Sequence, residues 1–159
     1  MSDKDANIDL MSQSFQQSAA LGERALQSDF VMEIEGMEWA SPLIRTSQLP
    51  DITRGEPVED QGQYGQMYHQ YGPPKRNGQI TAMIVELKDG RVEDAIWDIV
   101  QNKKYVNVRI YRFGEGHIKK GYLMRHTMIS SDPSDADSTA TTVAANRNMT
   151  LTYSWCDRI

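Results

Sequence analysis

The sequence predicts a mostly β fold, a β-barrel or sandwich with one flanking α-helix. Segments between residues 30 and 157 repeatedly alternate apolar and polar side chains, as half-buried strands do, whereas residues 91–103 repeat with the helical period. Clusters of glycine and proline separate these segments and indicate turns. At 159 residues, the chain has the length of one ordinary domain.

Residues 1–27 are predicted to form a polar N-terminal arm outside the folded domain of residues 28–159. The arm is rich in Ser, Gln and Asp, and only residues 13–26 have weak helical character. Two interpretations stay open: an arm that orders against a partner or stays mobile, and a frayed terminus.

The domain begins with two short predicted strands. In residues 30–34, Phe30, Met32 and Ile34 fall on one face, and Glu33 falls on the other, as does Glu35 after it. Residues 43–48 are the second strand, and the acidic residues 51–60 after it have no clear period.

Residues 61–78, QGQYGQMYHQYGPPKRNG, are predicted to be a long loop because Gly and Pro are so frequent. Long ordered loops in compact domains are usually functional or bound to a partner. Amphipathic rings bury area at low entropic cost, so the aromatic side chains of this loop suit an interface. They are Tyr64, Tyr68, His69 and Tyr71.

The middle of the chain predicts one strand and one helix. Residues 79–88 form a near-continuous apolar run, typical of a strand covered on both faces. The helix at residues 91–103 has an apolar side, with Asp94 and Asp98 opposite. Acidic residues early in this helix and lysines late in it complement the helix dipole.

Three further strands are predicted after the helix. Residues 105–113 and 118–129 alternate and are joined by a turn at Gly114–Gly116, and in the second of them Met124 and Met128 share a face. Residues 130–147 are a polar loop.

The last strand, residues 147–157, has the clearest alternation. Its apolar face consists of Met149, Leu151, Tyr153 and Trp155. Its polar face includes Thr150, Thr152 and Ser154.

Composition and charge exclude several functional classes. The 17 Lys and Arg against 22 Asp and Glu give a net charge of −5, which argues against sequence-nonspecific binding to nucleic acid. No segment approaches the roughly 18 apolar residues of a membrane span, and the N-terminus lacks the basic start and apolar core of a signal peptide. The single cysteine, Cys156, excludes an internal disulfide. We therefore expect a protein that is made and kept, or assembled, in the cytoplasm.

No catalytic, metal or cofactor site is predicted. The three histidines, His69, His117 and His126, lie in separate segments without metal-ligand spacing. The sequence contains no nucleophile elbow, no P-loop and no dinucleotide-binding fingerprint. An acidic cluster within residues 130–147 resembles half of a calcium loop but lacks its glycine and its closing glutamate.

Three stretches carry a family resemblance: FVMEIEG at residues 30–36, PLIRTSQLP at residues 42–50, and TLTYSW at residues 150–155. With the order of the elements and the chain length, they make residues 28–159 resemble the tail tube protein of contractile-tailed bacteriophages. The chain is more distantly similar to the type VI secretion tube protein. The loop at residues 61–78 departs from the pattern of the family.

The resemblance implies a structural virion protein and not an enzyme. Six subunits would form a ring, and stacked rings would form the inner tail tube through which the phage genome is ejected, with DNA passing the lumen without specific binding. The implied partners are other copies in the homo-hexamer, the tail sheath, the baseplate or initiator, and the tail terminator. The protein would be assembled in the host cytoplasm and reside in the tail of the virion.

This role suggests positions for the exposed residues. The candidates for facing the lumen are Glu33, Glu35, Thr150, Thr152 and Ser154, because acidic or small neutral side chains would repel or ignore phosphates. The candidates for contacts between rings are Tyr64, Tyr68, His69 and Tyr71, together with the N-terminal arm. Asp94 and Asp98 are the candidates for facing the sheath.

Two alternatives remain beside the tube subunit. One is a tube initiator or another baseplate protein of the same fold. The other is a monomeric β-barrel that binds a ligand, with the tyrosine-rich loop as the rim of its pocket.

Overall fold

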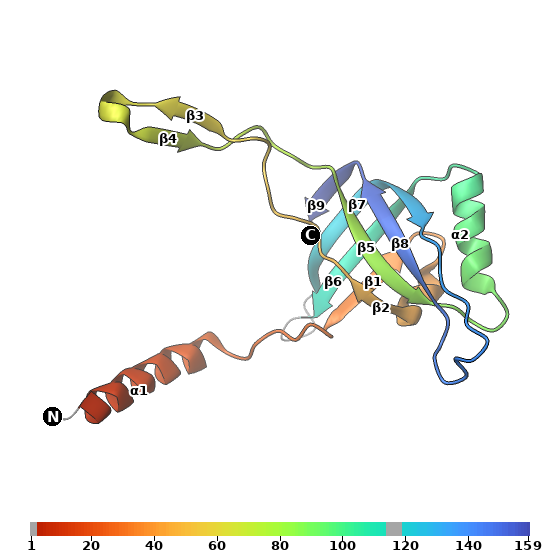
Figure 1. Ribbon diagram of the computed structural model, residues 1–159, viewed down its shortest axis with the longest axis horizontal. Coiled ribbons are helices and arrows are strands. Elements are labelled where there is room, and N and C mark those ends of the chain that lie inside the picture. The colour runs from red at the N-terminus through yellow and green to blue at the C-terminus, as the bar shows by residue number, and fades with distance from the viewer. Residues whose placement is uncertain (1–2, 114–118) are drawn as a thin grey trace.

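The computed structural model describes residues 3–113 and 119–159, and shows a strongly curved antiparallel sheet with a helix beside it (Figure 1). The helices are α1 (Asp3–Leu21) and α2 (Arg91–Gln101), and the short 3₁₀ turns are η1 (Glu38–Leu43) and η2 (Gln63–Gly65). The strands are β1 (Phe30–Ile34), β2 (Ile44–Ser47), β3 (Val58–Gln61), β4 (Met67–Gln70), β5 (Gly78–Val85), β6 (Val106–Phe113), β7 (Lys119–Ser131), β8 (Asn146–Tyr153) and β9 (Trp155–Arg158). The predicted fold class, mostly β with few helices, is confirmed.

Strand β7 connects the two halves of the sheet. Neighbouring strands follow the order β1-β6-β7-β8-β5-β2, and β9 also pairs with β7. The first part of β7 lies between β6 and β9, and its last part pairs with β8. One half of the sheet therefore contains β1, β6 and β9, and the other contains β2, β5 and β8.

A single hydrophobic core lies between these halves. It takes alternate residues from both and three residues from α2. Its largest fully buried apolar side chains are Met32, Ile34, Met37, Ile84, Val92, Val108, Ile110, Met124, Met149 and Leu151. Burying one such side chain contributes roughly 1.5–3 kcal/mol, so the core accounts for the closure of the sheet. The core faces predicted for β1 and β8 agree with this set.

The alternation of β7 changes phase at His126, which has a left-handed backbone with φ 54°. Met124 and Thr127 are both fully buried, whereas Met128 is 49% exposed. The prediction that Met124 and Met128 share a face is therefore wrong. The register between β6 and β7 shifts at the same place, as it does at a β-bulge, where the extra residue bends the strand.

The predicted last strand is two strands, because the chain breaks opposite this bulge. Ser154 separates β8 from β9, its amide donates to the Arg125 carbonyl at 3.3 Å, and its hydroxyl donates to the His126 carbonyl at 3.3 Å. Trp155 is 48% exposed and does not share the buried face of Tyr153, which corrects a second prediction. The alternation of buried and exposed residues shifts at the same level in β7 and in the β8–β9 segment, because both bend there.

Three other predictions differ from the structure. In β5, Ile80 and Ile84 are buried but Thr81 is exposed, so the strand is covered on one face only, because no second layer lies outside this part of the sheet. Helix α1 begins ten residues before the predicted start at Gln13. Residues 61–78 contain part of a β-hairpin, described below. The predicted turn at Gly114–Gly116 lies outside the described residues.

The predicted helix is present as α2, but it ends at Gln101, so the lysines predicted to complement its dipole lie beyond its last turn. Its N-terminus depends on a carboxylate that precedes the helix. Gly90 precedes the helix with φ 76° and has no side chain to cap it. Glu86, just after β5, accepts hydrogen bonds from the amides of Val92 at 3.2 Å and Glu93 at 2.8 Å. These amides have no partner within the helix, so Glu86 fixes the point where α2 begins.

Replacing this cap should destabilise the domain. We expect Glu86→Ala to lower the free energy of unfolding by about 1–2 kcal/mol, because two helix amides lose their acceptor. Chemical denaturation followed by circular dichroism measures the change. Glu23→Ala, in the exposed segment after α1, is the control and should leave the midpoint unchanged. Equal midpoints for both variants would show that Glu86 does not support α2.

Candidate assembly surfaces

The hairpin formed by β3 and β4 projects far from the sheet (Figure 1). All eight of its strand residues are exposed. At its tip, Tyr64 has a left-handed backbone with φ 60° and a fully exposed side chain. An isolated two-stranded hairpin is marginally stable at best in water. This hairpin is therefore suited to packing against a second surface.

The register of the hairpin separates its aromatic residues. Asp60 pairs with Tyr68 on one face, and Glu59 pairs with His69 on the other, where His69 Nδ1 lies 3.8 Å from the Glu59 carboxylate. Tyr64 is at the tip and Tyr71 follows β4. The structure thus brings the four predicted contact residues onto one projecting element, but it presents them in different directions.

The root of the hairpin is fastened to the sheet through Tyr153 of β8. The Tyr153 hydroxyl donates to Asp51 Oδ1 at 3.0 Å, where the chain leaves for the hairpin. It also lies over Gly78, where the chain returns, and a Cβ there would come within 2.4 Å of the hydroxyl oxygen. The glycine at position 78 therefore accommodates the close approach of the tyrosine side chain.

The hydrogen bonds at this root favour an ionised Asp51. The Thr53 hydroxyl at 2.9 Å, the Tyr153 hydroxyl and the Lys75 ammonium hold the pKa of the Asp51 carboxyl below its ordinary value of 3.8. Burial, and the hydrogen bond to Asp51, raise the pKa of Tyr153, which therefore stays protonated as the donor. Arg54 Nε closes the root from the other side by donating to the Gly72 carbonyl at 2.9 Å.

Helix α1 is the second projecting element (Figure 1). Its large apolar residues are exposed: Ile8 by 62%, Met11 by 70% and Phe15 by 73%. The helix ends at Gly22, which has φ 90°. Most helical stability in proteins comes from tertiary packing, and the exposed apolar residues of α1 show that it lacks such packing within the described residues. The division of the chain into an arm and a domain stays a prediction.

The candidates for facing the lumen fall on the two halves of the sheet. Glu33 lies on β1 opposite Arg109 of β6, and the Glu35 carboxylate accepts the Asn107 amide at 3.0 Å. Thr150 and Thr152 lie on the outward face of β8, half-buried, and Ser154 is at the break after it. The structure does not bring the two glutamates together with these hydroxyl residues.

The outward face of β8 continues across its neighbours as a row of small neutral side chains. Thr150 is opposite Thr81 of β5 and opposite Ser130 of β7. One step along, Thr152 is opposite Gln79 and Met128. Sequence analysis missed Thr81 and Ser130, because only the register of three strands makes them neighbours of Thr150.

The candidates for facing the sheath are both exposed on α2. Asp98 forms an ion pair with Lys104 at 2.6 Å, and the hydrogen bond from Lys104 lowers the pKa of the Asp98 carboxyl. Asp98 also accepts a hydrogen bond from the Asn102 side chain at 2.5 Å. The charge of Asp98 is therefore partly compensated within its own subunit.

Among the described residues, no three His, Cys, Asp or Glu side chains are placed to hold a metal ion, and His117 lies outside those residues. In the same part of the chain, neither helix combines the length and the apolar character needed to cross a membrane.

No protein-family model and no curated protein matches the sequence, but several solved structures match the fold. The tube terminating cap of the anti-feeding prophage has a TM-score of 0.63 at 12% identity, with 86% of this chain and 91% of that chain covered. A chain of the sheath–tube complex of an extracellular contractile injection system, PVC, has a TM-score of 0.62 at 13% identity, with 90% and 96% covered. The sheath/tube terminator of that system has a TM-score of 0.62 at 12% identity, with 86% and 97% covered. The chain therefore has the fold of contractile tube-like proteins, which confirms the resemblance at the level of fold.

The root of the hairpin gives a stability prediction that depends on pH. Tyr153→Phe should lower the free energy of unfolding at pH 7 by about 0.5–1.5 kcal/mol, because one hydrogen bond to Asp51 is lost. A carboxyl with a lowered pKa stabilises the fold above its unfolded pKa and loses that effect as the pH falls. The difference between the two proteins should therefore shrink below about pH 3.8, the ordinary value.

Denaturation curves at pH 7 and at pH 3 measure this difference. Tyr68→Phe, on the exposed hairpin, is the matched control and should change neither curve. A loss of stability in Tyr153→Phe that is the same at both pH values would contradict a role for the ionised Asp51.

Proposed function

We propose that the chain is the subunit of the inner tube of a contractile particle, in which rings of six copies stack inside a sheath. In a phage, the genome would pass through the bore of this tube. The observation that carries the proposal is a fold likeness over nearly the whole length of both chains, to structures that include a sheath–tube complex. The exposed hairpin and arm support it, because neither has a packing partner within the described part of the subunit.

The hairpin is proposed as the contact between successive rings. It carries Tyr64, Tyr68, His69 and Tyr71 on a short ladder that is marginal alone. Insertion of the hairpin into the next ring of subunits would bury these aromatic side chains. The same contact would stabilise the pairing of β3 with β4. The contact would therefore order the hairpin only where a ring is available to receive it.

The half of the sheet that contains β5 and β8 is proposed to face the bore. Its outward face carries the row of Thr81, Thr150 and Ser130, which are neutral and small. The outward face of the other half is charged, with Glu33 opposite Arg109 and with Arg125 in an ion pair with Asp157 at 2.9 Å. Because the two halves face away from each other across the core, only one of them can line a single bore. A conduit must not hold its cargo, which favours the neutral face.

A second candidate is a tube initiator or terminator of the same fold. The cap and the sheath/tube terminator match as well as the sheath–tube complex does. The number of copies per particle distinguishes these functions, because a tube subunit occupies many rings and an initiator or a terminator occupies the end of the tube.

Electron microscopy of the purified protein tests the tube directly. Negative-stain images over a concentration series should show rings, and then tubes with an open bore. A variant that lacks residues 59–69, the outer part of the hairpin, should stop at single rings because it lacks the contact to the next ring. Tubes of normal length from this variant would contradict the role of the hairpin. A wild-type protein that is monomeric at every concentration and binds a ligand saturably would favour the binding module.

Cysteine labelling tests which face lines the bore. In a Cys156→Ser background, Ser130→Cys should react with both a small and a polymer-linked maleimide in dissociated subunits. In assembled tubes it should react only with the small reagent, because the polymer cannot enter the bore. Asp94→Cys on α2 is the comparison and should react with both reagents in either state. Fast polymer labelling of Ser130→Cys within tubes would place this face outside.

A further inference from the structure

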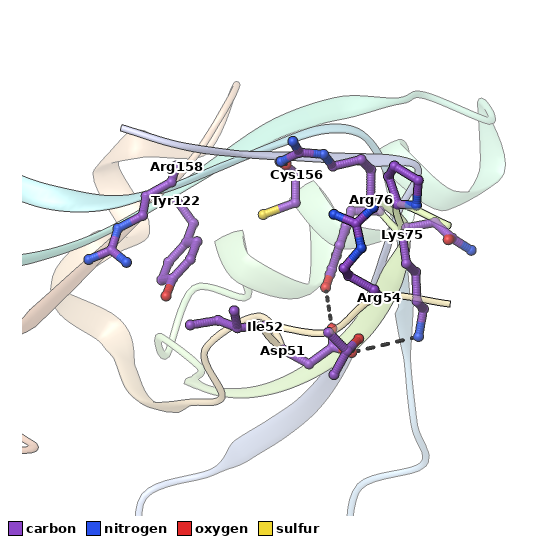
Figure 2. Close-up of a pocket in the computed structure, with 12 residues that line it drawn as sticks. Asp51, Ile52, Arg54, Lys75, Arg76, Tyr122, Cys156 and Arg158 are labelled. Atoms are coloured by element: carbon purple, nitrogen blue, oxygen red, sulfur yellow. Dashed lines mark hydrogen bonds and ion pairs between the residues drawn. The ribbon is translucent and has the colours of Figure 1, made fainter. Parts of the chain in front are cut away.

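A pocket of about 260 Å³ at the root of the hairpin gathers positive charge (Figure 2). It is lined by twelve residues from four parts of the chain, and four of them are cationic: Arg54, Lys75, Arg76 and Arg158. Its single acidic residue is Asp51. The Asp51 carboxylate already accepts hydrogen bonds from the hydroxyls of Thr53 and Tyr153. It also forms an ion pair with the Lys75 ammonium at 3.6 Å.

The three arginines are held without carboxylates. Arg54 donates to a backbone carbonyl, as described above. Arg76 donates to the Cys156 carbonyl at 3.3 Å, and its guanidinium lies 5.6 Å from the centre of the Trp155 ring. Arg158 lies 5.9 Å from the centre of the Tyr122 ring. Within the described residues, none of the three forms an ion pair, so their charges remain uncompensated in the subunit.

Such a pocket is selective for an anion. Carbonyls and aromatic rings fix the guanidinium groups in place, so an incoming carboxylate meets donors that are already arranged. The whole chain is acidic, with a net charge of −5, which makes a local gathering of four cations stand out. Acidic segments of the same protein are therefore suitable ligands.

The loop between β7 and β8, residues 132–145, carries uncompensated negative charge. Asp132, Asp135 and Asp137 are all exposed, and none of them forms an ion pair among the described residues. Figure 1 places this loop at the far side of the sheet from β9 and the hairpin. The root of the hairpin and the acidic loop thus lie at opposite ends of the folded part of the subunit.

We propose that the basic pocket of one subunit binds the acidic loop, residues 132–137, of a second copy of this chain. This inference rests on the proposed function and specifies a contact within the assembly. Because the two surfaces are different and lie at opposite ends, the contact is head-to-tail, the type that closes into rings or continues as a stack. Every subunit then binds the loop of one neighbour in its pocket, and its own loop lies in the pocket of another neighbour.

Charge reversal on each surface tests the contact. Arg158→Glu reverses one pocket cation, and Asp135→Arg reverses one loop aspartate. Each should raise the protein concentration needed for half-assembly by about tenfold, measured by sedimentation velocity, because like charges then meet. The two changes in one chain should restore assembly toward the wild-type concentration, since the pair is attractive again with its signs exchanged.

Lys88→Glu is the matched control for Arg158→Glu, because it makes the same change in net charge at an exposed site outside the pocket. Circular dichroism confirms that each variant is folded, and Asp135→Arg alters only an exposed loop. If Arg158→Glu assembles as Lys88→Glu does, or if the double variant is as impaired as the single ones, the inference is wrong while the proposed tube function stands.

Two other outcomes also overturn the inference. A wild-type protein that never assembles removes the proposed function and this contact together. Normal assembly of both single variants, with loss of inorganic phosphate binding in Arg158→Glu alone, would identify the pocket as a phosphate site.

Discussion

The structure depends on the bend that β7 and its neighbour share. Strand β7 must pair with β6 in one half of the sheet and with β8 in the other, and a flat strand cannot do both around one core. The left-handed residue His126 and the break at Ser154 lie opposite each other, so both strands turn at the same level. This joint bend closes the sheet over its core and also directs β9 toward the root of the hairpin. The pocket and the hairpin anchor are therefore consequences of how the core is enclosed.

Periodicity in the sequence predicted the elements whose pattern reflects burial against the core. The alternation around Met32, Ile110 and Leu151, and the helical period around Ile96, all match buried residues. The shift in the alternation of buried and exposed residues at His126 was not predicted. No glycine marks the position, and the pattern of residue types on either side continues. The hairpin was missed for a related reason: its strands, VEDQ and MYHQ, bury nothing within the subunit and so have no apolar face.

The basic pocket shows a different limit of sequence reasoning. Only Lys75 and Arg76 are neighbours in the chain, whereas Arg54 and Arg158 come from segments that tertiary structure alone brings to the same place. The same holds for Thr81, Thr150 and Ser130, which three strands place in one row. A site whose residues come from several strands depends on how those strands are paired. The pairing of β7 depends on the bulge at His126, which the sequence does not reveal.

The attachment of the hairpin has a mechanical consequence. The chain returns from the hairpin directly into β5 at Gly78, which pairs with Tyr153, and eight consecutive pairs then join β5 to β8 in antiparallel register. A pull on the hairpin along β5 would load this whole ladder in shear, so its hydrogen bonds would share the force and would not open one after another. The hairpin that reaches out of the subunit is thus attached to a ladder of the sheet that can bear tension along its strands.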